Sequence, residues 1–475
     1  MNTPIIDSLR RYSDEKNIRF HMPGHKGSSL GHDSLSTLEN RLFDLDVTEV
    51  DGTDNLHCPQ EAIEKSQQIA AGIYKAYKSY YLINGSTCGV YAMIAASVNR
   101  GDKIIIQRNC HRSVFMACFM WGLRIEYITP TVLEGFDIAA SIDPAHVQEV
   151  VENNQDAKAI VITSPTYYGT CLDIRAISNI TKKYNMSLLL DSAHGAHFPF
   201  LAQLPLRSIG LEADMHVVST HKTLPCLTQT AILNVSNSTR VDIDKLKFML
   251  HLYQSTSPSY ILMSSIEAGL SIMKTDGEKL LSRVISWISH LRDELPSFYT
   301  VLSPDENRAC IHCVDPTRLV ISCSLQGNQL LDILRQEYNI QVEMADARNI
   351  VIIGTAFDKE EDYRSLLSAL IDIENKYRDK QIRSNTKQIF DYSSTSSMPM
   401  DEAYLKPSVS IDIKESVGRI CGEMIAPYPP GIPVLLPGEI ITYNKIRCLK
   451  EAIDLDIQID GISDKTLKTI KVINT

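Results

Sequence analysis

Residues 187–197 read SLLLDSAHGAH, and residues 215–223 read MHVVSTHKT. Each stretch begins with a short apolar run and continues into polar residues, among them Asp191 and Lys222. Continuous apolar runs of this length are typical of strands that are buried on both faces of a parallel sheet. The two stretches therefore predict successive strands whose carboxyl ends carry a carboxylate and a lysine.

Two further runs, Lys103–Gln107 (KIIIQ) and Ala159–Thr163 (AIVIT), repeat this pattern. The stretches between the runs, such as Asp173–Tyr184, show helical spacing of apolar residues and an acidic residue near the start. Strands that alternate with helices predict an α/β domain with a mostly parallel, doubly wound sheet. In a sheet of this kind, ligands bind beyond the carboxyl ends of the strands.

The sequence predicts four segments along the chain. Residues 1–275 are expected to hold the N-terminal segment and the large α/β domain, and residues 276–377 a smaller α+β domain. Residues 378–403 are polar and rich in Ser and Thr, so we predict a linker. Residues 404–475 form a predicted C-terminal domain, in which the Pro/Gly run Ala426–Pro433 favours a fixed, non-regular surface over a helix.

Local patterns support the first domain boundary. Apolar spacing predicts a helix over Tyr260–Lys274, and Thr275-Asp-Gly277 predicts a turn that ends it. Beyond that turn, Leu319–Cys323 and Asn349–Ile353 are predicted strands, and Glu360–Tyr377 is a predicted helix.

Composition limits the kinds of partner that the protein is expected to have. The chain has 475 residues and a net charge of −10, which argues against sequence-independent nucleic-acid binding because that needs basic patches. The first twenty residues lack the layout of a signal peptide, and no apolar run is long enough to span a bilayer. We therefore expect a cytoplasmic protein with neither nucleic acid nor membrane as a partner.

The eleven cysteines are scattered, which favours free thiols inside the cell. Cys310-Ile-His-Cys313 is a single CxxC without a second pair, so a zinc or redox role is less favoured than a buried strand of small apolar residues. No metal site is expected.

Two more polar clusters fall near predicted strand ends. Asn84-Gly-Ser-Thr87 precedes a helix expected to start near Gly89, and small residues with free N–H groups at a helix N-terminus suit a phosphate. The same turn could be an ordinary cap. Asn109–Ser113 follows KIIIQ, and its His111 could lie flat on an aromatic cofactor or could be a surface histidine.

Asp191 and Lys222 each allow two interpretations. Asp191 could pair with a pyridinium nitrogen and keep it protonated, or it could cap a helix. Lys222 could form an imine, because burial lowers the pKa of an ammonium group, or it could be solvated like most lysines.

Taken together, these motifs resemble the bacterial ornithine/lysine/arginine decarboxylases of the aspartate-aminotransferase fold, in their short form without the N-terminal receiver-like wing domain. Eight motifs stand in the same order and span nearly the whole chain. They are FHMPGHKG (20–27), NGST (84–87), RNCHRS (108–113), SPTYYG (164–169), DSAHGAH (191–197), STHKTL (219–224), QSTSPSY (254–260), and GEM (422–424) with PYPPGIP (427–433).

The resemblance implies pyridoxal 5′-phosphate (PLP) as the cofactor and gives a role to each matching position. Lys222 would be the Schiff-base lysine, Asp191 would pair with the ring nitrogen, and His111 and Ala193 would pack on the two ring faces. The other cofactor-binding residues that it implies are Gly85, Ser86, Thr87, His194, Ser219, His221 and Thr256. The last of these would reach the phosphate of a neighbouring subunit.

The same resemblance implies decarboxylation of a basic amino acid to the corresponding amine and CO2, with arginine favoured slightly over lysine and ornithine. Lys222 or His111 would return a proton to Cα. Glu423 is the candidate carboxylate for the distal cation of the substrate, with Glu49, Asp51 and Asp54 left open. The expected assembly is a homodimer with the active site at the subunit interface, a larger homo-oligomer being left open. Polyamine biosynthesis is the favoured physiological role, with acid resistance left open.

Two rival functions remain. Another reaction on the same fold, by an aminotransferase, an aldolase or a β-eliminating lyase, would use the same lysine and aspartate, although no arginine clamp is evident near Asn349–Phe357. A catalytically silent PLP-binding relative is the other rival, and the intact cofactor positions argue against it. Cys58, Cys88 and Gly422 depart from the family pattern, and Cys58 could alter the substrate entrance.

Overall fold

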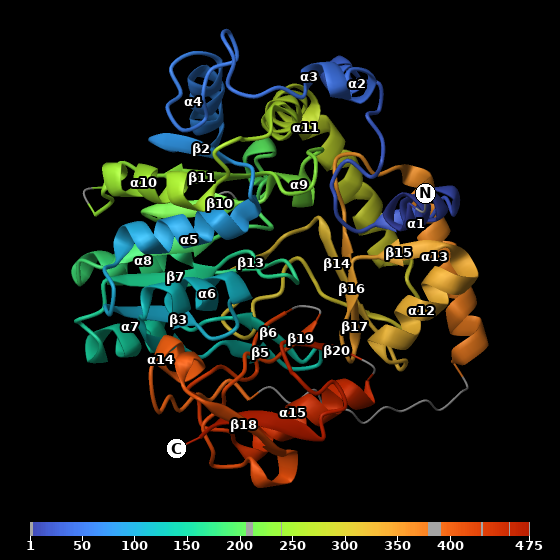
Figure 1. Cartoon of the computed structure of the whole chain (residues 1–475). Coiled ribbons are helices and arrows are strands. Elements are labelled where there is room, and N and C mark those ends of the chain that lie inside the picture. Colours follow the sequence, from blue (N-terminus) through green and yellow to red (C-terminus); the bar gives the residue numbers. More distant parts are fainter. Residues whose placement is uncertain are drawn as a thin grey trace.

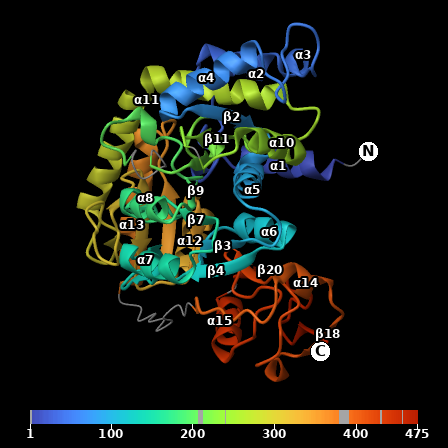
Figure 2. The same ribbon diagram turned by 90° about the vertical axis from the view of Figure 1, so that its left-hand side faces the viewer.

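The computed structural model describes residues 3–205, 212–238, 240–378, 391–428, 431–455 and 457–474 (Figure 1). It consists of a large α/β domain, a small domain beside it, and a C-terminal domain that lies below both in the two views of Figures 1 and 2.

The large domain is built on a seven-stranded sheet with the order β2-β11-β10-β9-β7-β3-β4. Six of these strands run in the same direction, and β11 runs opposite to them. The strands are β2 Lys78–Leu82, β3 Lys103–Gln107, β4 Arg124–Ile128, β7 Ala159–Thr163, β9 Ser187–Asp191, β10 Met215–Val218 and β11 Ala231–Val235. The predicted fold class is confirmed, and the four apolar runs in the sequence are strands of this sheet.

Side chains that alternate along the strands enter two separate cores. Ile104 and Ile106 of β3 pack in the same core as α5, α6 and α10, whereas Ile105 packs with α7 and α8 on the opposite face. This alternation is the period of two that a strand imposes on its side chains. The helices are α5 Gly85–Ser97, α6 Arg112–Trp121, α7 Pro144–Asn153, α8 Ile174–Lys183 and α10 Ile243–Tyr253.

The small domain holds a four-stranded antiparallel sheet, β12-β14-β17-β16, which packs against α12 and α13. Its elements are β12 Thr300–Val301, β14 Arg318–Ser322, α12 Gly327–Tyr338, β15 Ile340–Val342, β16 Met344–Ala345, β17 Asn349–Ile353 and α13 Glu360–Tyr377. The N-terminal segment, with α1 (Pro4–Asp14), joins this domain rather than the large one. Its strand β1 (Ile18–Phe20) pairs in parallel with β15, and Phe20 is buried in the small-domain core.

The predicted turn at residues 275–277 is wrong. Helix α11 runs without a break over Tyr260–Glu294, from the core of the large domain into that of the small domain. Gly277 is buried, and a Cβ added there would lie 3.1 Å from Phe200 Cβ and 3.1 Å from Met273 Cε. The glycine therefore permits close packing inside a helix whose other contacts outweigh its low helix propensity.

The C-terminal domain has its own core around α15 (Tyr443–Asp454) and the antiparallel pair β18 (Ser408–Asp412) and β21 (Thr469–Ile473). A second pair joins β19 (Ala426–Tyr428) to β20 (Gln458–Asp460), so the start of the Pro/Gly run is a short strand. Much of the predicted linker, residues 379–390, lies outside the described residues. Its end packs with the C-terminal domain and includes the first residues of α14 (Met400–Leu405).

Other sequence-based expectations concern membranes and cysteines. None of the helices that the structure describes combines the length and apolar character needed to cross a membrane. None of the eleven cysteines, all of which lie in the described ranges, forms a disulfide. The CxxC forms a strand only at β13 (Cys313–Val314), whereas Cys310 is exposed with a φ of +60°, so the predicted buried strand is only partly present.

Candidate active site

A cavity of about 370 Å³ opens at the carboxyl ends of β3, β7 and β9 and is closed on the far side by the C-terminal domain. Five of the predicted site residues line it: His111, Asp191, Ala193, His194 and Lys222. These residues come from separate strands and loops, and the parallel sheet brings them together because its strands end at one edge.

Lys222 lies in the one-turn helix α9 (Thr220–Thr223), which directly follows β10. Its Nζ is 3.0 Å from Nε2 of His194. Burial in the cavity wall lowers the pKa of Lys222, and the charges of Asp191 and Glu343 only partly oppose this effect. A lysine with a lowered pKa holds more of its neutral, nucleophilic form near neutral pH.

Asp191 is the last residue of β9 and is buried. Among the described residues, the backbone N–H of Ala193 is the one donor to its carboxylate, at 3.1 Å. Burial raises the pKa of Asp191, and the nearby Lys222 acts in the opposite direction. A buried carboxylate with so few partners suits a cationic N–H group that a ligand brings into the cavity.

His111 is the N-cap of α6, and its Nδ1 accepts from the backbone N–H of Ser113 at 3.2 Å and lies 2.9 Å from Ser113 Oγ. The ring is accessible from the cavity, and desolvation by the surrounding protein, followed by the charges of Lys222 and Arg112, lowers its pKa to about 4. His111 is therefore neutral at neutral pH, as a ring that stacks on an aromatic ligand should be.

Three of the predicted cofactor-binding residues, Ser86, Thr87 and Ser219, meet at the N-terminus of α5. This helix starts at Gly85 rather than near Gly89, so Ser86 and Thr87 lie in its first turn, where backbone N–H groups have no partner within the helix. Ser219 donates a hydrogen bond to Ser86 Oγ at 2.8 Å. Gly85 has a φ of +74°, a conformation that favours glycine. His221 lies beside Lys222 in α9 and contacts the carbonyl oxygen of Thr230 through Nδ1 at 2.9 Å.

Several predicted residues lie away from this cavity. Thr256 is exposed in the loop between α10 and α11. Glu423 is buried inside the C-terminal domain, where its carboxylate accepts from the backbone N–H groups of Ser463 (2.9 Å) and Lys471 (3.2 Å). Asp54 accepts from four backbone N–H groups, those of Asn55, Gln60, Glu61 and Ile63. Glu49 and Asp51 do not line the cavity either.

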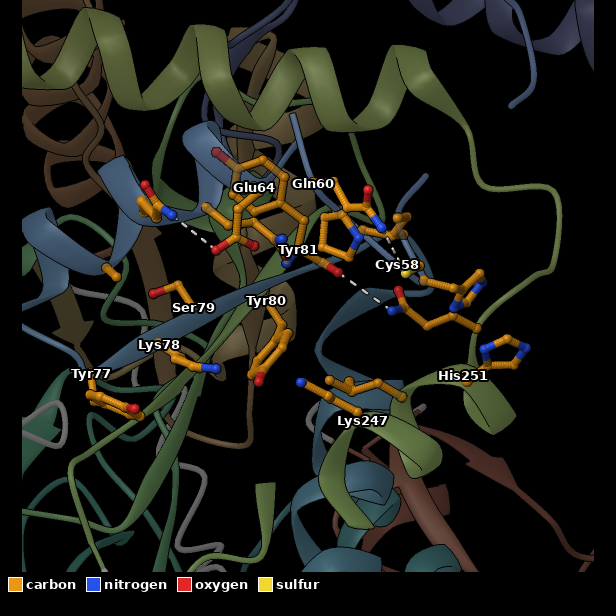
Figure 3. Close-up of a pocket in the computed structure, with 18 residues that line it drawn as sticks. Cys58, Gln60, Glu64, Tyr77, Lys78, Ser79, Tyr80, Tyr81, Lys247 and His251 are labelled. Atoms are coloured by element: carbon orange, nitrogen blue, oxygen red, sulfur yellow. Dashed lines mark hydrogen bonds between the residues drawn. The ribbon is translucent and has the colours of Figure 1, made fainter. Parts of the chain in front are cut away.

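Cys58 lines another, larger cavity of about 780 Å³, which lies at the β2 edge of the sheet. Figure 3 shows this cavity with Tyr80, Lys78 and Lys247. Helix α10 and the segment that contains Cys58 form part of its wall. The suggestion that Cys58 alters the entrance to the Lys222 cavity therefore has no support from its position.

Sequence reasoning missed a network that links three of the motifs, FHMPGHKG, SPTYYG and DSAHGAH, to the small domain. The Tyr167 hydroxyl donates to Glu343, whose other oxygen accepts from the backbone N–H of Met22 at 2.8 Å. Arg318 of β14 donates to His194 Nδ1 at 3.1 Å, and Lys26 forms a buried ion pair with Asp358 at 3.6 Å. No local pattern singles out Glu343 or Arg318, because both act across domains that are far apart in sequence.

The C-terminal domain supplies the wall opposite Lys222. Arg108 anchors this wall, because its guanidinium donates to the carbonyl oxygens of Pro433 (2.6 Å) and Val434 (3.2 Å). The RNCHRS and PYPPGIP motifs thus meet in space. One face of α15 points toward the cavity, with Cys448, Glu451 and Leu455 at spacings of three and four residues.

Comparison with known proteins agrees with these observations. The sequence profile described as "Orn/Lys/Arg decarboxylase, major domain" matches residues 3–322, and that of the family's C-terminal domain matches residues 383–465. The chain belongs to the Orn/Lys/Arg decarboxylase family. The resemblance stated from the motifs is confirmed, and so is the expectation of a decarboxylase of the basic amino-acid type at the level of the family.

Individual relatives span the whole chain. An arginine decarboxylase of Bacillus subtilis is 30% identical, with 99% of this chain and 98% of that protein covered. An arginine decarboxylase of Bacillus anthracis is 29% identical, with 99% and 97% covered. Among solved structures, a lysine decarboxylase of Francisella novicida superposes with a TM-score of 0.77 at 21% identity, covering 98% of this chain and 80% of that one. At that identity the superposition supports the fold alone.

Proposed function

We propose that this protein is a PLP-dependent decarboxylase of arginine, which it converts to agmatine and CO2. The observation that carries the proposal is the meeting of Lys222, Asp191 and His111 on one cavity that also reaches the carboxylate of Glu451 in the C-terminal domain. The full-length relatives named as arginine decarboxylases favour arginine over lysine and ornithine.

The residues of the cavity fit PLP. The buried carboxylate of Asp191 suits the ring nitrogen, and the first turn of α5 with Ser86 and Ser219 suits the phosphate. Two buried polar atoms on the cavity wall, Asn109 Oδ1 and Thr163 Oγ1, have no hydrogen-bond partner among the described residues, as expected where a ligand supplies it. When bound, PLP supplies the electron sink that makes loss of a carboxylate from Cα feasible.

The chain's own residues would orient the substrate and control one proton. Lys222 is the favoured proton donor to Cα, because its lowered pKa makes the ammonium form a readier acid than an ordinary lysine. His111, with its pKa near 4, is neutral and would stack rather than donate. Closure of the cavity by the C-terminal domain would keep water from the reacting centre.

Glu451 is our candidate for the distal cation of the substrate, in place of Glu423. Asp346 also lines the cavity, but the backbone N–H groups of Arg348 and Asn349, the Asn349 amide and the Tyr168 hydroxyl already donate to it. Within the described part of the chain, the side-chain partner of Glu451 is Arg447, at 3.9 Å. A carboxylate with so little competition can accept a bidentate guanidinium, and Asp391 on the same wall would add a second negative charge.

We also propose a homodimer that uses the α10 side of the large domain. Phe248 and Leu252 lie one turn apart on α10 and are 65% and 59% exposed, and adjoining exposed apolar side chains of this kind suit a surface that a partner covers. The Thr256 loop follows α10, and His57 of the neighbouring cavity wall contacts the carbonyl oxygen of Ser255 at 2.8 Å. Such a dimer would bring Thr256 near the partner's site. The cytoplasmic location and the role in polyamine biosynthesis stay predictions.

A product assay tests the proposed function. The purified protein with PLP is offered arginine, lysine and ornithine separately, and the amines are identified by mass spectrometry. Agmatine as the dominant product is the expected result. Cadaverine or putrescine instead would keep the reaction and change the substrate, whereas an imine absorption band without any amine would favour another PLP reaction or a silent relative.

A further inference from the structure

Arg318 is a buried cation directly behind the wall that carries Lys222. Its side chain is 1% exposed, and it starts β14 in the small domain. Its Nη2 donates to Nδ1 of His194 at 3.1 Å, and its Nε lies 3.9 Å from Asp315 Oδ2. A Cβ at Gly169 would lie 2.4 Å from Arg318 Cγ, so the glycine of the SPTYYG motif leaves the room that this arginine occupies.

His194 connects Arg318 to Lys222. The imidazole contacts Arg318 through Nδ1 and lies 3.0 Å from Lys222 Nζ through Nε2. The ring of Tyr167 packs against it with a centroid distance of 4.7 Å, and Glu343 accepts from the Tyr167 hydroxyl. The three groups Arg318, His194 and Lys222 therefore form one fixed chain of hydrogen bonds from the small domain to the cavity.

The donor and acceptor properties of these groups determine which nitrogen atoms carry protons along this chain of hydrogen bonds. A guanidinium has N–H donors only, so Nδ1 of His194 must present its lone pair to Arg318. A neutral imidazole carries its single proton on the other nitrogen, so Nε2–H donates toward Lys222. Lys222 can accept that bond only as a neutral amine, since an ammonium group has no lone pair.

We propose that, before the cofactor binds, Arg318 acting through His194 holds Lys222 as a neutral amine, and that both are positioning residues for the lysine. This inference deepens the proposed function, which gives Lys222 its role as the group that binds the cofactor's carbonyl. An ammonium at Lys222 would need the opposite histidine tautomer, whose Nδ1–H would then face the N–H of Arg318. Two opposed donors in a buried site are unfavourable.

Other charged groups around Lys222 also affect its protonation equilibrium. Asp191 at the end of β9 and Glu343 after β15 favour the ammonium form, whereas Arg318 opposes it. Burial is the largest cause of the lowered pKa of Lys222. Burial, then the charges of Lys222 and Arg318, hold the pKa of His194 well below its usual range, so this ring is neutral.

Two more histidines face the lysine. The desolvated rings of His111, at the start of α6, and His221, beside Lys222 in α9, each have a pKa of about 4. Both are neutral near pH 7, so neither changes its charge in the range where the state of Lys222 matters.

The first test is the tautomer of His194 in the full-length chain freed of PLP. Nitrogen-15 NMR of histidine-labelled protein distinguishes a lone-pair nitrogen from an N–H nitrogen, and His194→Phe identifies the signals. We expect Nε2–H with a lone pair on Nδ1 between pH 6 and 8. A spectrum with the proton on Nδ1, or on both nitrogens, would overturn the proposal without the need for any variant of Arg318.

The second test measures the charge of Lys222 by competitive labelling of the PLP-free protein with isotopic acetic anhydride over a range of pH. Mass spectrometry of the Lys222 peptide, with exposed Lys406 as the internal reference, gives the midpoint of labelling. Arg318→Met should raise the Lys222 midpoint by about one pH unit or more, which is about a tenfold loss of free amine at a fixed lower pH. Arg318→Lys retains an obligate donor and should restore most of the midpoint.

A matched pair of variants separates the hydrogen-bond chain from the charge of Arg318 alone. In a His194→Phe background, Arg318→Met should shift the Lys222 midpoint by less than half as much, because the connecting ring is gone. Equal shifts in both backgrounds would show that Arg318 acts by charge only and would contradict the proposal. Neither test needs turnover, so absence of amine in the product assay would defeat the proposed function and leave this inference standing.

Discussion

The two walls of the cavity differ in how they are built. The wall with Lys222, Asp191 and His194 is formed by strand ends of a buried sheet. Each of these three side chains is desolvated and makes at least one hydrogen bond. The opposite wall, with Glu451 and Asp391, comes from a helix face and loops of the C-terminal domain and is more accessible.

This difference suggests that the two walls have different functions. Fixed, desolvated groups can orient a cofactor and set the charge of a lysine, which any reaction on this fold requires. A carboxylate on the less buried wall can select a cationic side chain without touching the reacting atoms. Changes on the first wall should therefore reduce turnover, and changes on the second should alter which substrate binds.

The largest effect is expected for Lys222→Ala. Loss of the Lys222 amine should remove the visible imine band with PLP and reduce kcat by about 10³-fold or more. Absorption spectra and amine release measure the two losses. Retention of wild-type turnover would show that the first wall does not carry the chemistry.

Glu451→Gln tests the second wall. Loss of a charged partner of the guanidinium should raise KM for arginine by about tenfold to a hundredfold and change kcat by less than about threefold. Steady-state kinetics with arginine and with lysine measure the effect. If kcat falls and KM does not change, Glu451 is not a substrate contact and the two walls are not separate in function.

Glu423→Gln is the matched control in the same domain, because it changes a carboxylate that lies off the cavity. Ser463 and Lys471 donate to different oxygens of Glu423, and the amide NH2 that replaces one of these oxygens cannot accept, so thermal unfolding should show a loss of about 1–2 kcal/mol in stability. KM for arginine should stay within about twofold of the wild-type value. A large rise in KM would return Glu423 to the role that the sequence predicted.

The smallest effect is expected from the titration of His111. Its lowered pKa of about 4 means that it is already neutral above that pH and gains a proton only as the pH falls through it. The affinity for PLP should therefore change little through His111 between pH 6 and 8. The PLP affinities of the wild type and of His111→Phe are measured as a function of pH. A difference in pH dependence between the two proteins that is confined to pH 6–8 would contradict the lowered pKa.

The first wall could be predicted from sequence because its residues follow apolar runs in fixed order. KIIIQ and AIVIT are strands with the predicted bounds, and Lys222 and Asp191 lie where the strand ends place them. The second wall could not be predicted in this way. Glu451 stands in an ordinary amphipathic helix, so nothing local distinguishes it from Glu423, and only the fold shows which of the two faces the cavity.

The other errors arose in the same way, from contacts between distant segments. Gly277 gives a turn signal locally, but its packing against Phe200 keeps α11 continuous. The N-terminal strand β1 pairs with β15 more than three hundred residues later, which no local pattern indicates. Arg318 meets His194 through such a contact as well.

The central claim is that the first wall removes the α-carboxylate of the basic amino acid that the second wall selects. The most direct test supplies arginine labelled with carbon-13 at C1, alone and in competition with lysine, and follows labelled CO2 by mass spectrometry. We predict labelled CO2 in equal amount to agmatine, with lysine a poor competitor. Consumption of arginine to give a product that retains the labelled C1 would contradict the assigned decarboxylation.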